Sequence, residues 1–304
     1  MTTFRSNGKL LITAEYLVLD GVKALALPTK FGQSLTVEPI KEKKLFWKSI
    51  DHDGHVWFEK ELSVDSLVSS FNDSENLISK RLFEILISAK QLNPNFLNTE
   101  GGFNIITKLE FPKNWGLGSS STLINNIANW ANVNAFELLS LTFGGSGYDI
   151  ACAQNNSSIT YINNNDLKLK TIEPVEFNPI FKEGLFFVYL NQKQNSREGI
   201  KHYESNKTNA ANAIIKINSI TENIVTCQTI SEFETLILKH EQIISNLVKL
   251  PTVKSLLFPD YSRAIKSLGA WGGDFILATG NLEDMEYFKN KGFDTIVPYR
   301  DMIL

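Results

Sequence analysis

The chain has few cysteines and no excess of positive charge, and each shortage argues against a class of protein. Its 304 residues include two cysteines, Cys152 and Cys227, which lie too far apart for a metal-binding or redox motif. This argues against a disulfide-stabilised secreted domain and favours a reducing, cytoplasmic location. The formal net charge of −3 argues against a nucleic-acid partner, because phosphate backbones bind basic surfaces.

Long apolar runs are also missing. A membrane-spanning helix needs about 20 consecutive apolar residues, whereas the apolar segment GLFFVYL at 184–190 has the length of a strand. The N-terminal segment LLITAEYLVL is interrupted by Glu15, and no small-residue cleavage site follows it. We therefore expect neither a membrane span nor a signal peptide.

What the sequence does contain is a mixture of strand and helix patterns. With 43% hydrophobic and 21% charged residues, the chain is expected to form one large globular domain or two ordinary ones. Strand-forming patterns occur at 9–19, 34–39, 44–50, 55–61, 101–111, 157–162, 184–190 and 275–279. Helical spacing follows at 74–92, after 121, and at 134–142, 147–154, 197–226 and 231–248. Since strands and helices do not alternate strictly, we predict an α+β fold in two lobes, joined near 174–179.

The segment NWGLGSSSTLINN at 114–126 places two glycines and three serines directly before a predicted helix. A helix start carries unpaired N–H groups and the positive end of the helix dipole, so it attracts anions. Gly116 and Gly118 can adopt positive φ and let a bulky anion approach the backbone. The serine hydroxyls can cap the helix, donate to phosphate oxygens or ligand the Mg²⁺ of a nucleotide.

An ordinary glycine-rich helix cap would have the same composition, and composition alone does not decide between the two interpretations. The segment is not a Walker phosphate loop, because the pattern G-x-x-x-x-G-K-[ST] does not occur in the chain. The order of several motifs along the chain decides in favour of phosphate binding.

Four segments resemble, in order, the motifs of the GHMP small-molecule kinases, which include galactokinase, homoserine kinase, mevalonate kinase and phosphomevalonate kinase. SNGKLLITAEYLVLDG at 6–21 resembles the first motif, and 112–121 resembles the phosphate loop. GGSGYDIACA at 144–153 is similar to the segment that carries the family's aspartate, and KSLGAWGGDFILAT at 266–279 resembles the third motif. The resemblance spans nearly the whole chain and implies a kinase that uses ATP and Mg²⁺.

The resemblance also implies a fold and a reaction centre. The expected fold has an N-terminal ribosomal-protein-like β-α-β domain at 1–178 and a C-terminal ferredoxin-like α/β sandwich domain at 179–304. Lys9 would stabilise charge on the transferred phosphoryl group, while Asp149 would act as a base or orient the lysine. The nucleotide would contact Pro112, Gly116, Leu117, Gly118, Ser119, Ser120 and Ser121. Without the resemblance, Lys9 is a solvated charge at a strand edge and Asp149 a residue at a helix start.

The expected metal ligands depart from the family pattern. Many members carry a glutamate that helps to hold Mg²⁺, and its place falls at Leu138 or Leu139 in this chain. Glu137 is adjacent but out of phase on the predicted helix. Ser120 is therefore the expected direct protein ligand of Mg²⁺, which phosphates and water would otherwise hold.

The acceptor is expected to be a mevalonate-type small molecule, most closely phosphomevalonate. GKLLITAEYLVL and the Gly-Gly-Asp of the third motif resemble the phosphomevalonate kinase branch, although Trp271 replaces a middle glycine of that motif. Ser196 and Arg197 are expected to meet a substrate phosphate, because arginine binds oxyanions with two donors at once. The alternative for Arg197 is an exposed residue in a first helical turn. The remaining residues expected around the substrate are Glu15, Gly147, Gly269, Gly272 and Gly273.

Other interpretations stay open at this point. Mevalonate is the second acceptor, and either a monomer or a homodimer fits the sequence. Glu15 is equally well explained as a buried strand residue, and Gly269, Gly272 and Gly273 as a tight turn. A non-catalytic nucleotide-binding protein of this fold is a further alternative. The weakest is a metal hydrolase using the HDGH segment at 52–55, which sits in a predicted hairpin turn with no third ligand nearby.

Overall fold

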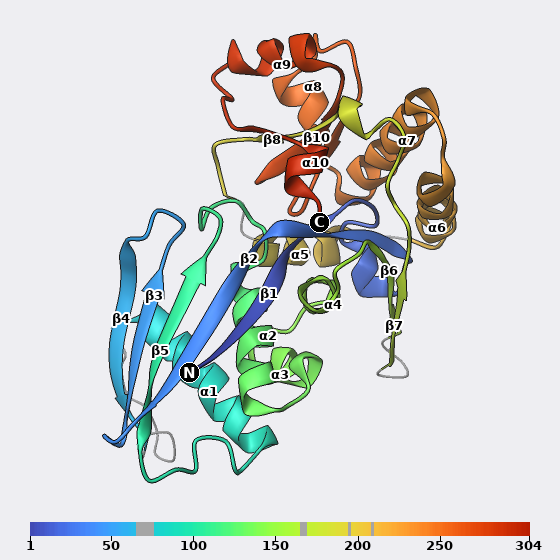
Figure 1. The fold of residues 1–304 in the computed structure, drawn as a ribbon. Coiled ribbons are helices and arrows are strands. Elements are labelled where there is room, and N and C mark those ends of the chain that lie inside the picture. The colour runs from blue at the N-terminus through green and yellow to red at the C-terminus, as the bar shows by residue number, and fades with distance from the viewer. Residues whose placement is uncertain (65–75, 165–168, 194–195, 208–209) are drawn as a thin grey trace. The chain divides into compact units, whose positions relative to one another are not determined.

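The computed structural model describes residues 1–64, 76–164, 169–193, 196–207 and 210–304 (Figure 1). They group into two compact units. The first comprises residues 1–8, 31–113 and 118–154, and the second comprises 9–30, 114–117 and 155–304. This grouping by contact is discontinuous along the chain, and the contiguous domains 1–178 and 179–304 stay a prediction.

The first unit is a mixed sheet with helices. Its elements are β1 (Thr2–Leu11), β2 (Ala24–Ile40), β3 (Lys44–Ile50), β4 (Val56–Ser63), β5 (Gly102–Leu109), α1 (Leu77–Leu92), α2 (Ser119–Ala131), α3 (Ala135–Thr142) and α4 (Tyr148–Gln154), with β1 and β2 continuing into the second unit. The strands lie in the order β4–β3–β5–β2, and β1 pairs with β2. β3 runs parallel to β5, whereas the β3–β4 and β2–β5 pairs are antiparallel.

Large apolar side chains fill the space between this sheet and its helices. On β3, Leu45 and Trp47 are buried while Phe46 between them is exposed, as expected for a strand with one covered face. Ile105 of β5, Leu86 of α1 and Ile127 of α2 belong to the same buried cluster. Burying each such side chain stabilises the fold by about 1.5–3 kcal/mol. This packing fixes α2, whose first turn contains the three serines of the glycine-serine segment.

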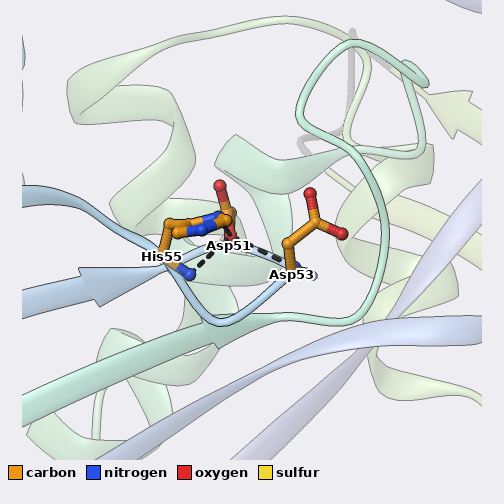
Figure 2. Close-up of side chains that lie close together, drawn as sticks. All are labelled: Asp51, Asp53 and His55. Carbon is orange, nitrogen blue, oxygen red and sulfur yellow. Dashed lines mark hydrogen bonds and ion pairs between the residues drawn. The ribbon is translucent and has the colours of Figure 1, made fainter.

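The DHDG segment forms the turn between β3 and β4 (Figure 2). Asp51 Oδ1 accepts hydrogen bonds from the backbone N–H groups of Asp53 at 3.1 Å and His55 at 3.0 Å. The candidate ligand atoms of these three residues lie within 4.8 Å of one another, but Asp53 and His55 are exposed. Aspartate side chains that bond the following backbone are a normal device of such turns. We therefore assign this cluster to the hairpin and not to a metal site.

The second unit contains a four-stranded antiparallel sheet in the order β11–β8–β10–β9, and β6 pairs with β7 and with residues 24–26 of β2. Its 3-10 helices are η1 (Leu17–Asp20) and η4 (Lys182–Gly184). Its strands are β6 (Ile159–Asn164), β7 (Leu169–Pro174), β8 (Leu185–Tyr189), β9 (Ile265–Ser267), β10 (Phe275–Thr279) and β11 (Ile296–Pro298). Its α-helices are α5 (Ser196–Asn206), α6 (Ala211–Thr226), α7 (Ile230–Val248), α8 (Val253–Leu257), α9 (Leu282–Lys289) and α10 (Tyr299–Met302).

One apolar cluster holds β9 and β10 in place. Ile265 of β9 and Ile276 of β10 are buried together with Phe258 and with Phe288 of α9. The rings of Phe258 and Phe288 meet edge to face with their centroids 5.0 Å apart. The glycine-rich third motif, which joins β9 to β10, is therefore anchored at both ends by buried strands.

The predicted α+β fold is confirmed, and most predicted elements are present. The hairpin of β3 and β4, the helix at 231–248 and the strand FILAT agree with the structure to within a few residues. Residues 74 and 75 of the predicted helix at 74–92 lie outside the described residues. Across the part of the chain that is described, no helix combines the length and the apolar character that crossing a membrane requires.

Two predicted elements differ from the structure, and one strand was not predicted. The strand expected at 9–19 ends at Leu11, because buried polar contacts described below fold the chain into a tight turn before η1. The helix expected at 197–226 is two helices: α5 ends at Asn206, whose side-chain amide bonds back to the His202 carbonyl at 2.8 Å. Strand β7, with charged residues and a terminal proline, was not expected.

Candidate active site

The glycine-serine segment enters α2 through two glycines with left-handed backbone. Gly116 has a φ of 66° and Gly118 a φ of 88°. Gly118 is the N-cap of α2, so the N-cap offers no side-chain oxygen to the first-turn N–H groups. Ser119 and Ser121 are half-buried and Ser120 is exposed. This arrangement suits an anion at the helix start.

The first half of this segment lies against the third motif, and both belong to the second unit. A Cβ added to Gly116 would collide with the carboxylate of Asp274, the residue just before β10. The Trp115 ring meets Phe275 of β10 edge to face, with centroids 5.4 Å apart. The phosphate loop and the third motif, about 150 residues apart in sequence, are therefore neighbours, as the resemblance implies.

We call residues 268–274 the glycine loop. It is a tight turn, because the Gly273 N–H donates to the Ala270 carbonyl at 2.9 Å and the Leu268 N–H to the Phe275 carbonyl at 3.1 Å. Gly269 and Gly272 have φ values of 71° and 77°, which favour glycine. The tight turn expected as the simpler interpretation is thus present, and it is the same turn that meets Gly116.

Lys9 lies on β1, beside the phosphate loop. Its backbone N–H donates to the carbonyl of buried Leu117 at 3.0 Å, and its side chain is half-buried. This hydrogen bond joins the first motif directly to the residue between the two loop glycines.

Asp149 lies in the first turn of α4, in the first unit. It follows Gly147, which has a φ of 90°, and its side chain is half-buried. The Gln154 side chain donates to Asn125 Oδ1 at 2.9 Å, which fixes α4 against α2. Asp149 therefore belongs to the same unit as the first turn of α2. Lys9 belongs to the other unit, and the meeting of Lys9 with Asp149 stays a prediction.

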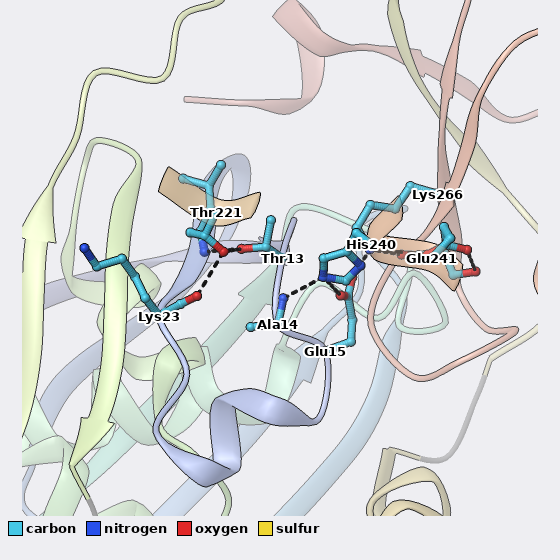
Figure 3. A network of polar contacts seen from close by, with 10 residues as sticks. Thr13, Ala14, Glu15, Lys23, Thr221, His240, Glu241 and Lys266 are labelled. Atoms are coloured by element: carbon cyan, nitrogen blue, oxygen red, sulfur yellow. Dashed lines mark hydrogen bonds and ion pairs between the residues drawn. The ribbon is translucent and has the colours of Figure 1, made fainter. Parts of the chain in front are cut away.

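Glu15 lies in a fully buried polar cluster of the second unit (Figure 3). Lys266 Nζ, on β9, lies 2.5 Å from Glu15 Oε1 and 3.5 Å from Glu241 Oε1. Ser267 Oγ donates to Glu241 Oε2 at 2.9 Å.

A histidine completes this cluster. His240 Nε2, on α7, accepts a hydrogen bond from the Ala14 N–H at 2.9 Å. The structure therefore directs the Glu15 carboxylate to a buried lysine, in agreement with the alternative of a buried glutamate.

Proton positions in this cluster follow from its hydrogen bonds. Because His240 Nε2 accepts from Ala14, the ring is neutral with its proton on Nδ1. Burial and the nearby Lys266 lower the pKa of His240 well below its usual value. Glu15 Oε2 lies 3.3 Å from the same Nε2, so when Glu15 is ionised two hydrogen-bond acceptors face each other. Burial raises the pKa of Glu15 to about 7, although Lys266 opposes the shift.

This cluster predicts a pH dependence of stability. The Glu15 carboxyl titrates near 4.5 when unfolded and near 7 when folded, so between these pH values the folded protein binds more protons. Glu15 therefore lowers the free energy of unfolding as pH rises from 4.5 to 7, by at most roughly 3 kcal/mol. His240 acts oppositely below its usual pKa of 6.5, because its folded form resists protonation.

A comparison of Glu15→Gln with the wild type isolates the glutamate, since the histidine is common to both. Urea unfolding at pH 4.5 to 8 should show the variant gaining stability relative to the wild type up to pH 7, with a constant difference above it. Parallel stability curves for the two proteins would contradict the prediction.

Helix α5 carries the residues expected to meet a substrate phosphate. It begins at Ser196, whose side chain lies outside the part of the chain that the structure describes, and Arg197 is exposed in its first turn. The Tyr203 ring of α5 stacks on the Tyr16 ring of the first motif, with centroids 5.5 Å apart. The second unit thus places α5 beside the first motif.

The expected departure in metal binding stays a prediction. Leu138 is fully buried in the apolar cluster, so no carboxylate occupies the position of the family's metal glutamate. Glu137 is exposed on α3, out of phase with Leu138, as its position on a helix predicts. The exposed Ser120 at the start of α2 is chemically suited to a hard cation beside phosphate oxygens.

Four residues around Glu15 and Tyr16 were missed at the sequence level, namely His240, Glu241, Lys266 and Trp271 as a hydrogen-bond donor. Lys266 gave at most a weak signal, because it follows the apolar pair Ala264 and Ile265 directly before the glycine loop, and a lysine that is buried must find an acid. His240 and Glu241 sit on a helix where charged residues are common, so their pattern carried no signal.

Comparisons with known proteins identify the fold of the chain. No protein-family model matches the chain, and no curated protein sequence matches it. Solved structures match over nearly the whole length. The mevalonate kinase of Methanococcus jannaschii has a TM-score of 0.71 and 15% identity, covering 97% of this chain and 96% of that one.

Two other solved structures are similar to the same extent. The phosphomevalonate kinase of Streptococcus pneumoniae in complex with phosphomevalonate and AMPPNP has a TM-score of 0.70 and 15% identity, covering 96% of both chains. The galactokinase of Lactococcus lactis in complex with galactose has a TM-score of 0.68 and 15% identity, covering 95% of this chain and 87% of that one. The chain therefore has the fold of the GHMP kinases, which confirms the fold that its motifs imply.

Proposed function

We propose that this protein is an ATP-dependent kinase that transfers the γ-phosphoryl group to a mevalonate-type acceptor, most closely phosphomevalonate. One observation carries the proposal: Gly116 and Gly118 lead with positive φ into a helix capped by glycine, and the glycine loop lies against Gly116. The S. pneumoniae protein of this fold, solved with phosphomevalonate and AMPPNP, supports both the nucleotide and the acceptor.

The proposed roles follow from the chemistry of phosphoryl transfer, which depends mainly on positioning and on electrostatic stabilisation. The first-turn N–H groups of α2 hold the nucleotide phosphates, and the Lys9 ammonium neutralises charge on the transferred group. Asp149 accepts the proton of a hydroxyl acceptor, or orients Lys9 when the acceptor is a phosphate, whose second pKa of about 6 leaves it largely ionised. Mg²⁺, held by Ser120, would supply charge neutralisation when bound.

A coupled assay of ADP release tests the function directly. We expect release with Mg-ATP only when a mevalonate-type acceptor is present, and phosphomevalonate, mevalonate, homoserine and galactose should be compared at equal concentration. Faster turnover of mevalonate than of phosphomevalonate would identify the alternative acceptor. If none of the four acceptors reacts, the proposed substrate class is wrong. ATP binding without turnover would favour a non-catalytic nucleotide-binding protein.

The variant Arg197→Ala tests whether an acceptor phosphate binds at the start of α5. The guanidinium is exposed in the first turn of α5, where it can bind a phosphate with two donors. We expect the KM for phosphomevalonate to rise by roughly 10- to 100-fold, because a charge-assisted hydrogen bond contributes about 1.5–3 kcal/mol. The KM for ATP should stay unchanged.

Lys201→Ala is the matched control, since Lys201 is an exposed cation one turn later on the same helix. It should leave both KM values close to those of the wild type. An equal rise for phosphorylated and unphosphorylated acceptors in Arg197→Ala would instead indicate a structural role for the arginine.

A further inference from the structure

The first motif contains an unusual backbone turn at residues 14–16. Ala14 has a φ of 67°, and Tyr16 has a φ of 62° with a ψ of −47°. The Leu17 N–H donates to the Glu15 carbonyl at 2.7 Å, which closes a three-residue γ-turn centred on Tyr16. A γ-turn with positive φ at a side-chain-bearing residue is rare and strained. Such a conformation persists only where the surroundings enforce it.

Fully buried groups enforce this turn from one side. His240 accepts the Ala14 N–H at 2.9 Å, and the Glu15 carboxylate is held by Lys266 (Figure 3). Lys266 Nζ also donates to the Ser267 carbonyl at 2.9 Å, and Ser267 bonds Glu241. The turn is therefore fixed to α7 and β9, and β9 leads directly into the glycine loop.

On its other side the turn presents Tyr16 to the glycine loop. The Tyr16 hydroxyl accepts a hydrogen bond from the Trp271 N–H at 2.8 Å. The Trp271 indole N–H donates to the Pro251 carbonyl at 2.8 Å, so this residue is held at both its backbone and its side chain. Trp271 stands where the resemblance leads us to expect a glycine. The chain thus has a bulky, doubly anchored residue at the centre of the loop, with Tyr16 as its backbone partner.

Tyr16 also packs against helix α5. Its ring stacks on Tyr203 at an interplanar angle of 15°, and a Cβ added to Gly199 would lie 2.7 Å from the Tyr16 hydroxyl oxygen. The Tyr203 hydroxyl donates to Asp20 at the end of η1, and Lys207 Nζ lies 2.7 Å from the same carboxylate. Helix α5 therefore packs against the segment that contains Tyr16, and the Tyr16 side chain contacts both α5 and the glycine loop.

We propose that Tyr16 is a positioning residue that sets the spacing between the glycine loop and the first turn of α5, and thereby the fit of the acceptor. The strained turn aims this side chain, the hydroxyl fixes the loop at Trp271, and the ring and Gly199 fix the helix that carries Arg197. The proposal deepens the proposed function and rests on it, because α5 and the glycine loop are the segments expected around the acceptor.

Tyr16→Phe removes the hydroxyl and keeps the ring stack. Loss of one hydrogen bond of about 1 kcal/mol should raise the KM for the acceptor roughly five- to tenfold, while kcat and the KM for ATP change less than twofold. Tyr261→Phe is the matched control, because it too removes a buried tyrosine hydroxyl with one backbone partner: this hydroxyl donates to the Thr279 carbonyl at 2.6 Å, whereas that of Tyr16 accepts from Trp271. It should lower the melting temperature without changing the acceptor KM. An unchanged acceptor KM in Tyr16→Phe, or equal rises for ATP and acceptor, would overturn the proposal.

A second variant tests the spacing itself. Gly199→Ala places a methyl group against the hydroxyl and should raise the acceptor KM, and the double variant Tyr16→Phe/Gly199→Ala should be less impaired than the two single effects together predict. Strict additivity would contradict a shared contact.

Amide hydrogen exchange separates this proposal from the proposed function. In Tyr16→Phe, exchange should accelerate most in residues 268–274, where the Trp271 N–H loses its acceptor, and less in the first turn of α5, which keeps the ring stack, while Tyr261→Phe should leave both segments unchanged. If no acceptor is turned over but exchange changes in this way, the proposed substrate fails and the positioning role stands. If exchange in these two segments is unaltered, the positioning role fails whatever the activity.

Discussion

Asp149→Asn is expected to lower turnover by about 10²–10⁴ with an acceptor that reacts through a hydroxyl group, because general-base catalysis contributes an effect of this size. With an acceptor that reacts through a phosphate, the loss should be much smaller, since such a group is already largely ionised at neutral pH. The same variant therefore reports both on the role of Asp149 and on the chemical class of the acceptor.

The measurement is kcat with each acceptor at saturating Mg-ATP, accompanied by a thermal melt. Asp149 is half-buried in the first turn of α4, and the melt shows whether the Asp149→Asn protein still folds. Wild-type turnover with every acceptor would reject the base role.

Glu137→Gln is the matched control for Asp149→Asn. Glu137 is also an acidic residue in the first turn of a helix of the same unit, but it is exposed and out of phase with the buried face of α3. We expect its turnover and its dependence on Mg²⁺ to equal those of the wild type. A marked loss of Mg²⁺ affinity would show that Glu137 takes the place of the family's metal glutamate after all.

Local patterns predicted those parts of the fold that local chemistry determines. The DHDG turn is set by Asp51 accepting from the next residues of its own hairpin, and the apolar spacing of 231–248 suffices for α7. The end of β1 depends instead on His240 and Lys266, more than 200 residues away, which turn a segment rich in strand formers into a strained γ-turn. Such long-range polar contacts leave no periodic signal in the segment that they deform.

The candidate site shows the same division. The order of glycines and serines predicted the left-handed turns and the start of α2, because glycine is needed wherever φ is positive. The partners of Glu15 and Tyr16 could not be predicted, since a lysine, a histidine and a tryptophan in separate elements are unremarkable until the fold brings them together. Trp271 departs from the family pattern already in the sequence, but its backbone contact with Tyr16 arises only when the fold brings the two segments together.

Gly116→Ala is expected to reduce kcat/KM for ATP by roughly 100-fold, because displacing a catalytic loop by about 1 Å has effects of this order. Two causes combine at this position. An alanine at a φ of 66° costs about 1–2 kcal/mol, and its Cβ would collide with the Asp274 carboxylate, so the phosphate loop or the glycine loop must move.

Gly54→Ala separates these two causes. Gly54 has a φ of 88° in the exposed hairpin turn, and a Cβ there would meet no atom within 4 Å. This variant should lose about 1–2 kcal/mol of stability and keep the wild-type KM for ATP. Combining Gly116→Ala with Asp274→Ala removes the collision but keeps the backbone strain. The double variant should therefore regain part of the kcat/KM for ATP that Gly116→Ala loses. An equal loss of kcat/KM for ATP in Gly116→Ala and in Gly116→Ala/Asp274→Ala would show that backbone strain alone acts, and that the contact between Gly116 and Asp274 has no part in binding the nucleotide.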